Sequence, residues 1–353
     1  MDPYTENLPL FVTSSGGPKS LHTIPVKLLQ KILGYCDFPA IQSLLKVEAH
    51  LRRFIHSNLP RFSYSNIRIT VLGSEIQLII QFAETEILKI SYEKDEENRV
   101  KISSDFSNFN RKKSETLENS GEIQDLAVDD FRDLLKFQNG VLEVLEFSHD
   151  SEDSEFFSKF SETIGIAQLR ARELKMSTNN NSNEILRILG LLNPENLRIL
   201  TLENSGAELE DVPIFVGLND IENMQNCEQW RSLEELDAPK FQFSFEIEDY
   251  LHFKKIRAQF LYLNTEHLLV LKQTFLASGP PKHFRFTYQL LQDHQNFLET
   301  FGPYLRNEEN WTASWFYRTR FGAKILMVKV LEDVVELDFI EQSGVPEGAV
   351  VQD

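Results

Sequence analysis

The chain contains little cysteine, with only Cys36 and Cys227 among its 353 residues. Two cysteines so far apart cannot build a disulfide framework, so a disulfide scaffold is excluded and a reducing setting is expected. Apolar runs such as Leu78–Ile80 are far shorter than the ~20 residues that span a bilayer. The N-terminus carries Asp2 and Glu6 and no apolar stretch, so no signal peptide is expected. We therefore expect a cytoplasmic or nuclear protein that is not secreted and has no membrane partner.

The sequence also lacks the spaced motifs of common catalytic chemistries. It has no HExxH helix, CxxC pair, GxxxxGK[ST] phosphate loop, GxGxxG fingerprint or GxSxG elbow. Nothing marks a base or an anion hole for a cysteine nucleophile. No catalytic residue, metal ion or cofactor is therefore predicted. His149 beside Asp150 favours a solvated loop over a weak cation site, whereas His252 and Trp230 are expected in the core.

Charge is distributed unevenly along the chain, whose formal net charge is −18. Such a balance argues against nucleic acid as the main partner, because phosphate binding requires clustered Lys and Arg. Residues 19–61 carry seven Lys and Arg against two acidic residues, a net charge of +5, and residues 62–353 carry −21. This asymmetry indicates different partners for the two parts. The acidic part favours a target with a basic patch.

Residues 25–60 show three apolar patterns with helical spacing. Pro25 suits the first turn of a helix, and residues 28–33 place apolar side chains on one face. A second helix is expected after Asp37-Phe38-Pro39 and a third before Pro60. Helices in about 40 residues bury too little surface by themselves. They are therefore expected to dock either on the rest of this chain or on another protein.

This pattern resembles the F-box, a three-helix motif that binds the Skp-type adaptor of Skp–cullin–F-box (SCF) ubiquitin ligases. The resemblance rests on Leu21, Ile24, Pro25, Leu28, Leu29, Ile32, Leu33, Asp37-Phe38-Pro39, Ile41, Leu44, Val47, Leu51-Arg52 and Ile55. It implies adaptor binding through Pro25, Leu28, Leu29, Ile32, Leu33, Leu44, Leu45, Val47, Leu51 and Ile55. The adaptor of that family is acidic, which suits the basic segment. Glu48-Ala49-His50 departs from the family, where many members have Cys and a bulky aromatic residue.

In the middle of the chain, apolar and polar residues alternate with period two, and a polar stretch follows. Residues 67–71, 76–82 and 87–92 predict three strands of a small antiparallel sheet. Residues 103–124 are polar and poor in β-branched side chains, which predicts a flexible linker. The linker is therefore placed between a small β segment and the larger acidic part.

The acidic part alternates helical and extended patterns. Helices are expected over 128–137, 156–164 and 184–192, and strands over 141–147, 173–176 and 197–202. The strand centres near Leu145, Leu174 and Leu200 are 29 and 26 residues apart, close to leucine-rich-repeat periods. Irregular repeat-like units are predicted, with an ordinary α/β domain as the alternative. Residues 324–330 and 334–339 predict a terminal hairpin, and the tail from Gln342 is expected to be mobile.

A second block resembles the FTH domain, which follows the F-box in a nematode-expanded group of F-box proteins. The resemblance rests on Ile188-Leu189, Leu192-Asn193-Pro194, Leu197, Ile199, Leu202, Glu228-Gln229-Trp230-Arg231, His252-Phe253, Leu268, Leu271, Phe275-Leu276, Ser278 and Phe284-Arg285-Phe286. It covers roughly residues 125–300. Residues 232–236 are more acidic than the family pattern. The resemblance implies a domain that binds target proteins.

Together these features predict an α/β (α+β) chain. Its parts are a tail (1–19), an F-box (20–60), a β segment (61–102), a linker (103–125), an FTH-type recognition region (126–340) and a mobile tail (341–353). The resemblances imply a non-catalytic substrate adaptor that binds a Skp-type subunit, through it a cullin, and a target marked for ubiquitination. A protein-interaction module outside any ligase, or a hydrolase or transferase with an unfamiliar site, remains an alternative. The sequence names neither the target nor its binding face.

Overall fold

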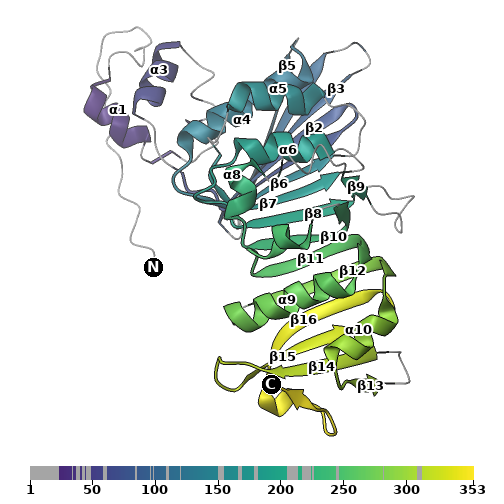
Figure 1. Ribbon diagram of the computed structural model, residues 1–353. Helices are drawn as coiled ribbons and strands as arrows, with labels where there is room; N and C mark the ends of the chain where they lie inside the picture. The colour runs from purple at the N-terminus through teal and green to yellow at the C-terminus, as the bar shows by residue number, and fades with distance from the viewer. Residues whose placement is uncertain are drawn as a thin grey trace, which may run out of the picture. The chain divides into compact units, whose positions relative to one another are not determined.

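The computed structural model describes most of the chain, and Figure 1 shows the described elements as ribbons. It describes residues 24–33, 35–36, 40–41, 44, 49–58, 62–83, 86–95, 97, 99–108, 111–119, 121–149, 155–165, 169–178, 182–204, 214–216, 224, 226–243, 246–280, 282–307 and 312–353. The chain divides into two compact units, residues 1–62 and 63–353. The predicted tail over 1–19 lies outside the described residues, as do Leu45 and Val47.

The first unit contains helices α1 (Val26–Leu33) and α3 (Ala49–Ser57). Pro25 precedes α1, and its carbonyl accepts hydrogen bonds from the backbone N–H groups of Leu28 and Leu29. The Gln30 side chain donates to Asn58 Oδ1 over 2.6 Å, which joins α1 to the end of α3. The predicted second helix lies mostly outside the described residues, so the three-helix arrangement stays a prediction.

The second unit is a mixed α/β structure built on one sheet. Its strands are β1 (Asn66–Leu72), β2 (Glu75–Ala83), β3 (Glu86–Lys94), β4 (Val100–Asn108), β5 (Arg111–Asn119), β6 (Leu142–His149), β7 (Ala171–Thr178), β8 (Ile199–Asn204), β9 (Ile214–Val216), β10 (Glu235–Phe243), β11 (Lys255–Leu263), β12 (His283–Leu291), β13 (Leu305–Asn307), β14 (Thr312–Arg318), β15 (Lys324–Val330), β16 (Val334–Glu341) and β17 (Val351–Gln352). Its helices are α4 (Ile123–Phe137), α5 (Glu155–Ile164), α6 (Ser182–Leu191), α8 (Glu228–Ser232), α9 (Thr265–Ser278) and α10 (His294–Phe301), with 3₁₀ turns η2 (Ile247–Tyr250) and η3 (Gln342–Gly344).

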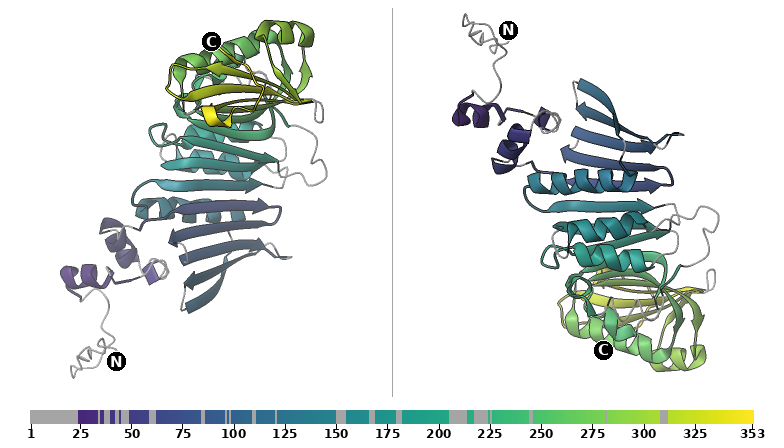
Figure 2. Two further views of the ribbon diagram at one scale, coloured as in Figure 1. Left: turned by 90° about the horizontal axis from the view of Figure 1, so that it is seen from below. Right: turned by 90° about the horizontal axis from the view of Figure 1, so that it is seen from above.

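Across the sheet, strand pairing changes from antiparallel to parallel and back to antiparallel. Strands β1 to β5 form an antiparallel meander, and β1 also pairs in parallel with β6. Strands β6, β7, β8, β10, β11 and β12 then follow one another in parallel. Beyond β12, strands β16, β15, β14 and β13 return to antiparallel pairing. The two views of Figure 2 show helices over one face of the sheet and the other face open.

One row of buried apolar side chains runs across the strands on the helix-covered face. Successive register partners are Ile67, Leu145, Leu174, Leu200, Leu236, Ile256, Phe284 and Leu337. Each of these side chains is at most 1% exposed. We call them the inner row. Because side chains alternate between faces along a strand, the inner row also fixes which residues face outward.

Aromatic side chains attach the helices to this face. Phe131 of α4 and Phe160 of α5 lie with ring centres 5.0 Å apart, and Phe160 packs on Phe147 of β6 at 5.3 Å. In α9, the ring of Phe275 lies 4.9 Å from that of Phe284 in the inner row. Buried aromatic residues of this kind contribute much of the apolar area that stabilises a domain.

Most of the predicted elements of the second unit are confirmed. The three antiparallel strands appear as β1, β2 and β3, and the terminal hairpin appears as β15 and β16. The helix–strand alternation appears as α4, β6, α5, β7, α6 and β8. The leucine-rich-repeat likeness of their spacing stays a prediction.

The structure corrects two expectations. Residues 103–108 and 111–119, expected to belong to a flexible linker, lie in strands β4 and β5, which pair along their whole length. Only Val100 and Phe106 of β4 are buried apolar residues, so the sequence of β4 carries little apolar signal, although its backbone pairs with β5. The tail from Gln342, expected to be mobile, forms η3 and β17, and Gln352 donates to the Pro303 carbonyl over 2.9 Å.

Replacing Leu200 with alanine is expected to lower the free energy of unfolding by about 2–5 kcal/mol, because it opens a cavity in the inner row. The matched control is Leu290→Ala, since Leu290 is 56% exposed and should change stability by only about 0.5 kcal/mol. Urea unfolding followed by tryptophan fluorescence measures both. Equal losses for the two variants would contradict the central role of the inner row.

Candidate protein-interaction surfaces

An apolar stripe on α1 faces solvent. Leu28 is 51% exposed and Ile32 40%, and they lie on one face of the helix because they are four residues apart. Tyr35, just after the helix, is 81% exposed. We call Leu28, Ile32 and Tyr35 the α1 stripe. Clustered exposed apolar side chains of this kind mark protein interaction sites.

The structure divides the residues predicted to bind an adaptor into two groups. Pro25, Leu28 and Ile32 are exposed, and Leu44 is half-buried. The buried residues of the group, which build the core of the first unit, are Leu29, Leu33, Leu51 and Ile55. The predicted residues Leu45 and Val47 lie outside the described residues. The exposed members can contact a partner directly, whereas the buried ones shape the surface that carries them.

The second surface is the outer face of the sheet, opposite the inner row. Its side chains form ion pairs between neighbouring strands. These pairs are Arg68–Glu146 (2.8 Å), Lys175–Glu203 (2.9 Å), Arg257–Asp237 (2.9 Å), Lys255–Glu235 (3.9 Å) and Arg285–Glu336 (3.8 Å). His283 Nδ1 lies 3.4 Å from Asp338 Oδ2, a contact that becomes an ion pair when His283 is protonated. Exposed pairs of this kind contribute little to stability, about 0–1 kcal/mol each. The outer face is therefore free to serve recognition.

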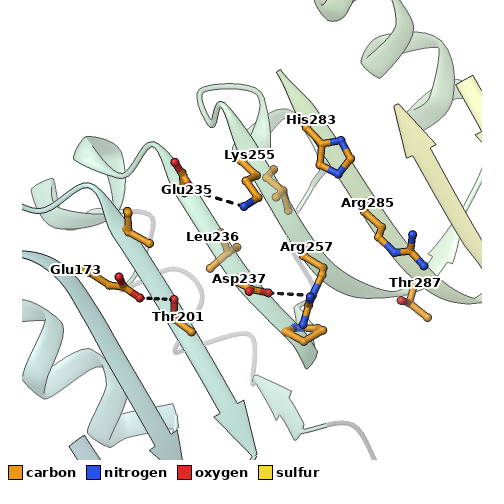
Figure 3. Close-up of a pocket in the computed structure, with 13 residues that line it drawn as sticks. Glu173, Thr201, Glu235, Leu236, Asp237, Lys255, Arg257, His283, Arg285 and Thr287 are labelled. Atoms are coloured by element: carbon orange, nitrogen blue, oxygen red, sulfur yellow. Dashed lines mark hydrogen bonds and ion pairs between the residues drawn. The ribbon is translucent and has the colours of Figure 1, made fainter. Parts of the chain in front are cut away.

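The outer face is hollowed over β7, β8, β10, β11 and β12. This hollow has a volume of about 670 Å³ and is the site drawn in Figure 3. Glu235 and Asp237 of β10 line it on one side, and Lys255 and Arg257 of β11 lie beside them. On β12 the next outward residues are His283 and Arg285. Acidic side chains of β10 and basic side chains of β11 and β12 therefore line the same hollow.

Sequence reasoning missed this arrangement, although the sequence contains a trace of it. Three segments repeat the order charged–apolar–charged, namely Glu235-Leu236-Asp237, Lys255-Ile256-Arg257 and His283-Phe284-Arg285. The middle residue of each segment belongs to the inner row. Only the strand register shows that the flanking charges become neighbours.

A smaller hollow of about 420 Å³ lies at the ends of β12 and β15 and is lined mainly by apolar residues. Tyr288 lines it, and its hydroxyl donates to the Leu331 carbonyl over 2.8 Å. Burial, with the nearby Asp333 and Glu332, raises the pKa of Tyr288 to about 12. The phenol is therefore a neutral donor at physiological pH, which suits a structural role.

His149 lies in the core rather than in a solvated loop. The prediction of a solvated turn is wrong, because His149 ends β6 with only 2% of its side chain exposed. Its Nδ1 lies 3.4 Å from Oε2 of Glu184, which is equally buried, and its ring packs against Phe157. The polar residues around His149 in the sequence gave no indication that α6 would bring a buried carboxylate to it.

The residues that carry the resemblance of the second block are divided between core and surface. Gln229, Trp230 and Phe253 are buried, as expected for Trp230, whereas His252 is exposed and the expectation that it lies in the core is wrong. Trp230 is buried, and its ring lies 5.3 Å from that of Phe253. Gln229 Nε2 donates to the Leu192 carbonyl, and His252 Nε2 lies 3.2 Å from the Trp230 carbonyl. Desolvation of the ring lowers the pKa of His252, which favours a neutral ring that donates from Nε2. The Gln-Trp and His-Phe elements therefore hold α8 and the η2 turn in place.

Cys227 caps α8, where its sulfur accepts a hydrogen bond from the Trp230 N–H. Burial raises the pKa of the Cys227 thiol. A thiol with a raised pKa is a poor nucleophile, because the thiolate is the reactive form. This geometry supports a packing role for Cys227.

Among the described residues, no cluster of three or more His, Cys, Asp or Glu side chains has the geometry to hold a metal ion. In the same part of the chain, no helix is long and apolar enough to cross a membrane.

Comparisons with known proteins agree with the resemblance stated from the sequence. Residues 154–304 match the FTH domain. The chain is similar to F-box A protein 224 of Caenorhabditis elegans, with 21% identity over 308 residues that cover 85% of this chain and 74% of that protein. No solved structure matches. The predicted resemblance to F-box proteins with an FTH domain is therefore confirmed.

Replacing Glu184 with alanine is expected to lower the free energy of unfolding by about 1–3 kcal/mol, because it removes one partner of a buried polar pair. The double variant His149→Phe/Glu184→Leu should recover most of this loss, since apolar residues of similar size can replace such a pair. Urea unfolding of the three chains measures both effects. A double variant as unstable as Glu184→Ala would show that the site depends on more than this pair.

Proposed function

We propose that this chain is a substrate-recognition subunit of an SCF-type ubiquitin ligase. In this proposal the first unit is an F-box that binds a Skp-type adaptor and, through it, a cullin. The observation that carries the proposal is the α1 stripe, in which Leu28 and Ile32 are exposed beside the buried Leu29 and Leu33. The FTH match and the relative named as an F-box protein support it.

The chemistry of α1 fits a large protein partner. Apolar side chains at i and i+4 suit a helix that packs against a partner's groove. Lys27 and Lys31 on the same helix are exposed, and they can attract an acidic adaptor before contact. The stripe would supply affinity, and the lysines would accelerate association.

The second unit would bind the target through its outer face. That face is open, charged and hollowed, and its ion pairs have little structural value. The helix-covered face is occupied by packing, as the contact of Phe275 with Phe284 shows. The outer face is therefore the better candidate for recognition.

The mechanism would be proximity rather than chemistry by this chain. Holding a target near a ubiquitin-loaded enzyme raises the effective concentration of a target lysine. The proposal needs no catalytic residue, metal ion or cofactor in this chain. It places the protein in the cytoplasm or nucleus, where such ligases would meet their targets.

Replacing Leu28 or Ile32 with alanine is expected to weaken binding to a purified Skp-type adaptor by about 2 kcal/mol each, roughly 30-fold. Because both side chains are exposed, their truncation can weaken binding without unfolding the chain. Isothermal titration calorimetry gives the affinities, and circular dichroism checks the helices. Leu29→Ala and Leu33→Ala should also reduce binding, but with a loss of stability, because both side chains are buried.

Leu290→Ala provides the matched control, since it removes an exposed leucine from the second unit and should bind the adaptor normally. Deleting residues 20–60 should abolish binding. If the full chain does not bind the adaptor, the protein is instead an interaction module outside a ubiquitin ligase. If it binds and Leu28→Ala and Ile32→Ala bind equally well, the α1 stripe is not the contact.

A further inference from the structure

The hollow of the outer face contains an unusual arrangement of like charges. Arg257 of β11 and Arg285 of β12 are register partners, and Lys255 and His283 are register partners two residues earlier on the same face. We call β11 and β12, which carry these four residues, the basic pair of strands. Neighbouring strands lie about 4.8 Å apart, and like charges placed directly opposite each other are destabilising.

Acidic strands flank the basic pair of strands on both sides. Glu235 and Asp237 of β10 are register partners of Lys255 and Arg257, and Asp338 and Glu336 of β16 are register partners of His283 and Arg285. The order of charge across β10, β11, β12 and β16 is therefore acidic, basic, basic, acidic. The repulsion between the basic side chains of β11 and β12 is therefore offset by the acidic side chains of β10 and β16.

The two arginines keep binding capacity toward solvent. Arg257 contacts Asp237 through Nε at 2.9 Å, and Arg285 contacts Glu336 through one terminal nitrogen at 3.8 Å. A guanidinium group has five N–H donors, so each arginine retains donors for another acceptor. Both side chains are about half exposed, and Figure 3 shows them lining one hollow.

We propose that the basic pair of strands binds one carboxylate side chain of the target, and that the two acidic strands bind basic residues on either side of it. This inference rests on the proposed function, in which the outer face binds the target. It adds the charge order of the bound segment. That segment reads basic, acidic, basic.

Strand spacing sets the separation of these charges. From β10 to β16 the sheet spans three strand intervals, about 14 Å. An extended peptide rises about 3.3 Å per residue, so residues four apart are about 13 Å apart and face the same side. A segment crossing the strands would therefore carry basic residues at positions one and five and Asp or Glu at position three.

The flanking carboxylates favour a carboxylate over a phosphate at the central position. Four acidic side chains, Glu235, Asp237, Glu336 and Asp338, belong to the strands adjacent to the basic pair. A phosphate carries nearly two negative charges at pH 7, which increase both its attraction to the basic side chains and its repulsion from the acidic ones. The four carboxylates outnumber the three permanent cations Lys255, Arg257 and Arg285, so the second charge meets net repulsion. The two oxygens of a carboxylate provide one acceptor for each arginine.

The test uses the full chain and fluorescein-labelled nine-residue peptides in fluorescence anisotropy at low salt. The probe has the core Lys-Ser-Glu-Ser-Lys, and its matched control Glu-Ser-Lys-Ser-Lys has the same composition in another order. A third peptide has phosphoserine in place of glutamate. We expect the probe to bind at least tenfold more tightly than the reordered control and than the phosphopeptide. Equal binding of probe and control overturns the charge order, and tighter binding of the phosphopeptide overturns the carboxylate.

Two variants test the residues. Arg257→Gln/Arg285→Gln removes both charges without adding repulsion and should weaken probe binding at least tenfold, with unchanged thermal unfolding. Arg257→Glu/Arg285→Glu should prefer a peptide with lysine at the central position, a reversal that a purely structural role would not produce. Unchanged probe binding by both variants overturns the inference. Both variants should still bind the Skp-type adaptor, so loss of peptide binding with intact adaptor binding separates this inference from the proposed function.

Discussion

The fold depends on the requirement that the strands from β1 through β6 to β12 and β16 bury one face against the helices. The inner row meets that requirement from Ile67 to Leu337, across strands that run both parallel and antiparallel. Because the side-chain period of a strand is two, a slip of one residue would move charged side chains such as Arg257 into the core. The inner row therefore determines the register, and the register determines which charges become neighbours on the outer face. The arrangement of charges on the outer face is in this sense a consequence of burial at the inner face.

The first unit shows a similar division between buried and exposed residues within a single helix, α1. Leu29 and Leu33 are buried, while Leu28 and Ile32, one position earlier in each case, are exposed. The rotation of 100° between successive helix residues produces this separation without any change in residue type. An apolar residue on α1 therefore has a structural or an interaction role according to its position, which its identity alone does not reveal. This is why substitutions at the two faces have different physical meanings.

The sequence predicted those elements whose side-chain pattern alone determines them. Alternation over β1, β2 and β3 and the helix–strand order from α4 to β8 were sufficient, because each element buries its own apolar stripe. Strand β5 was missed because its residues, Arg111–Asn119, carry little apolar alternation and pair mainly through the backbone. The pair of His149 with Glu184 and the charged strands of the hollow were missed for another reason. They join segments distant in sequence, and only the register and the helix packing bring them together.

The net charge of −18 and the charge order of the hollow act over different distances. Net charge attracts a basic partner from afar, but at physiological salt this attraction is screened beyond about 8 Å. Inside the hollow, a partner of the proposed kind would meet Arg257 and Arg285 between two acidic strands, at contact distances where screening by salt is weak. A uniformly basic segment would be attracted and then opposed by the two arginines. A segment with the matching order of charges would be attracted at long range and would also pair with the charged side chains of the hollow. Net charge would then attract many partners, and the order of charges in the hollow would discriminate among them.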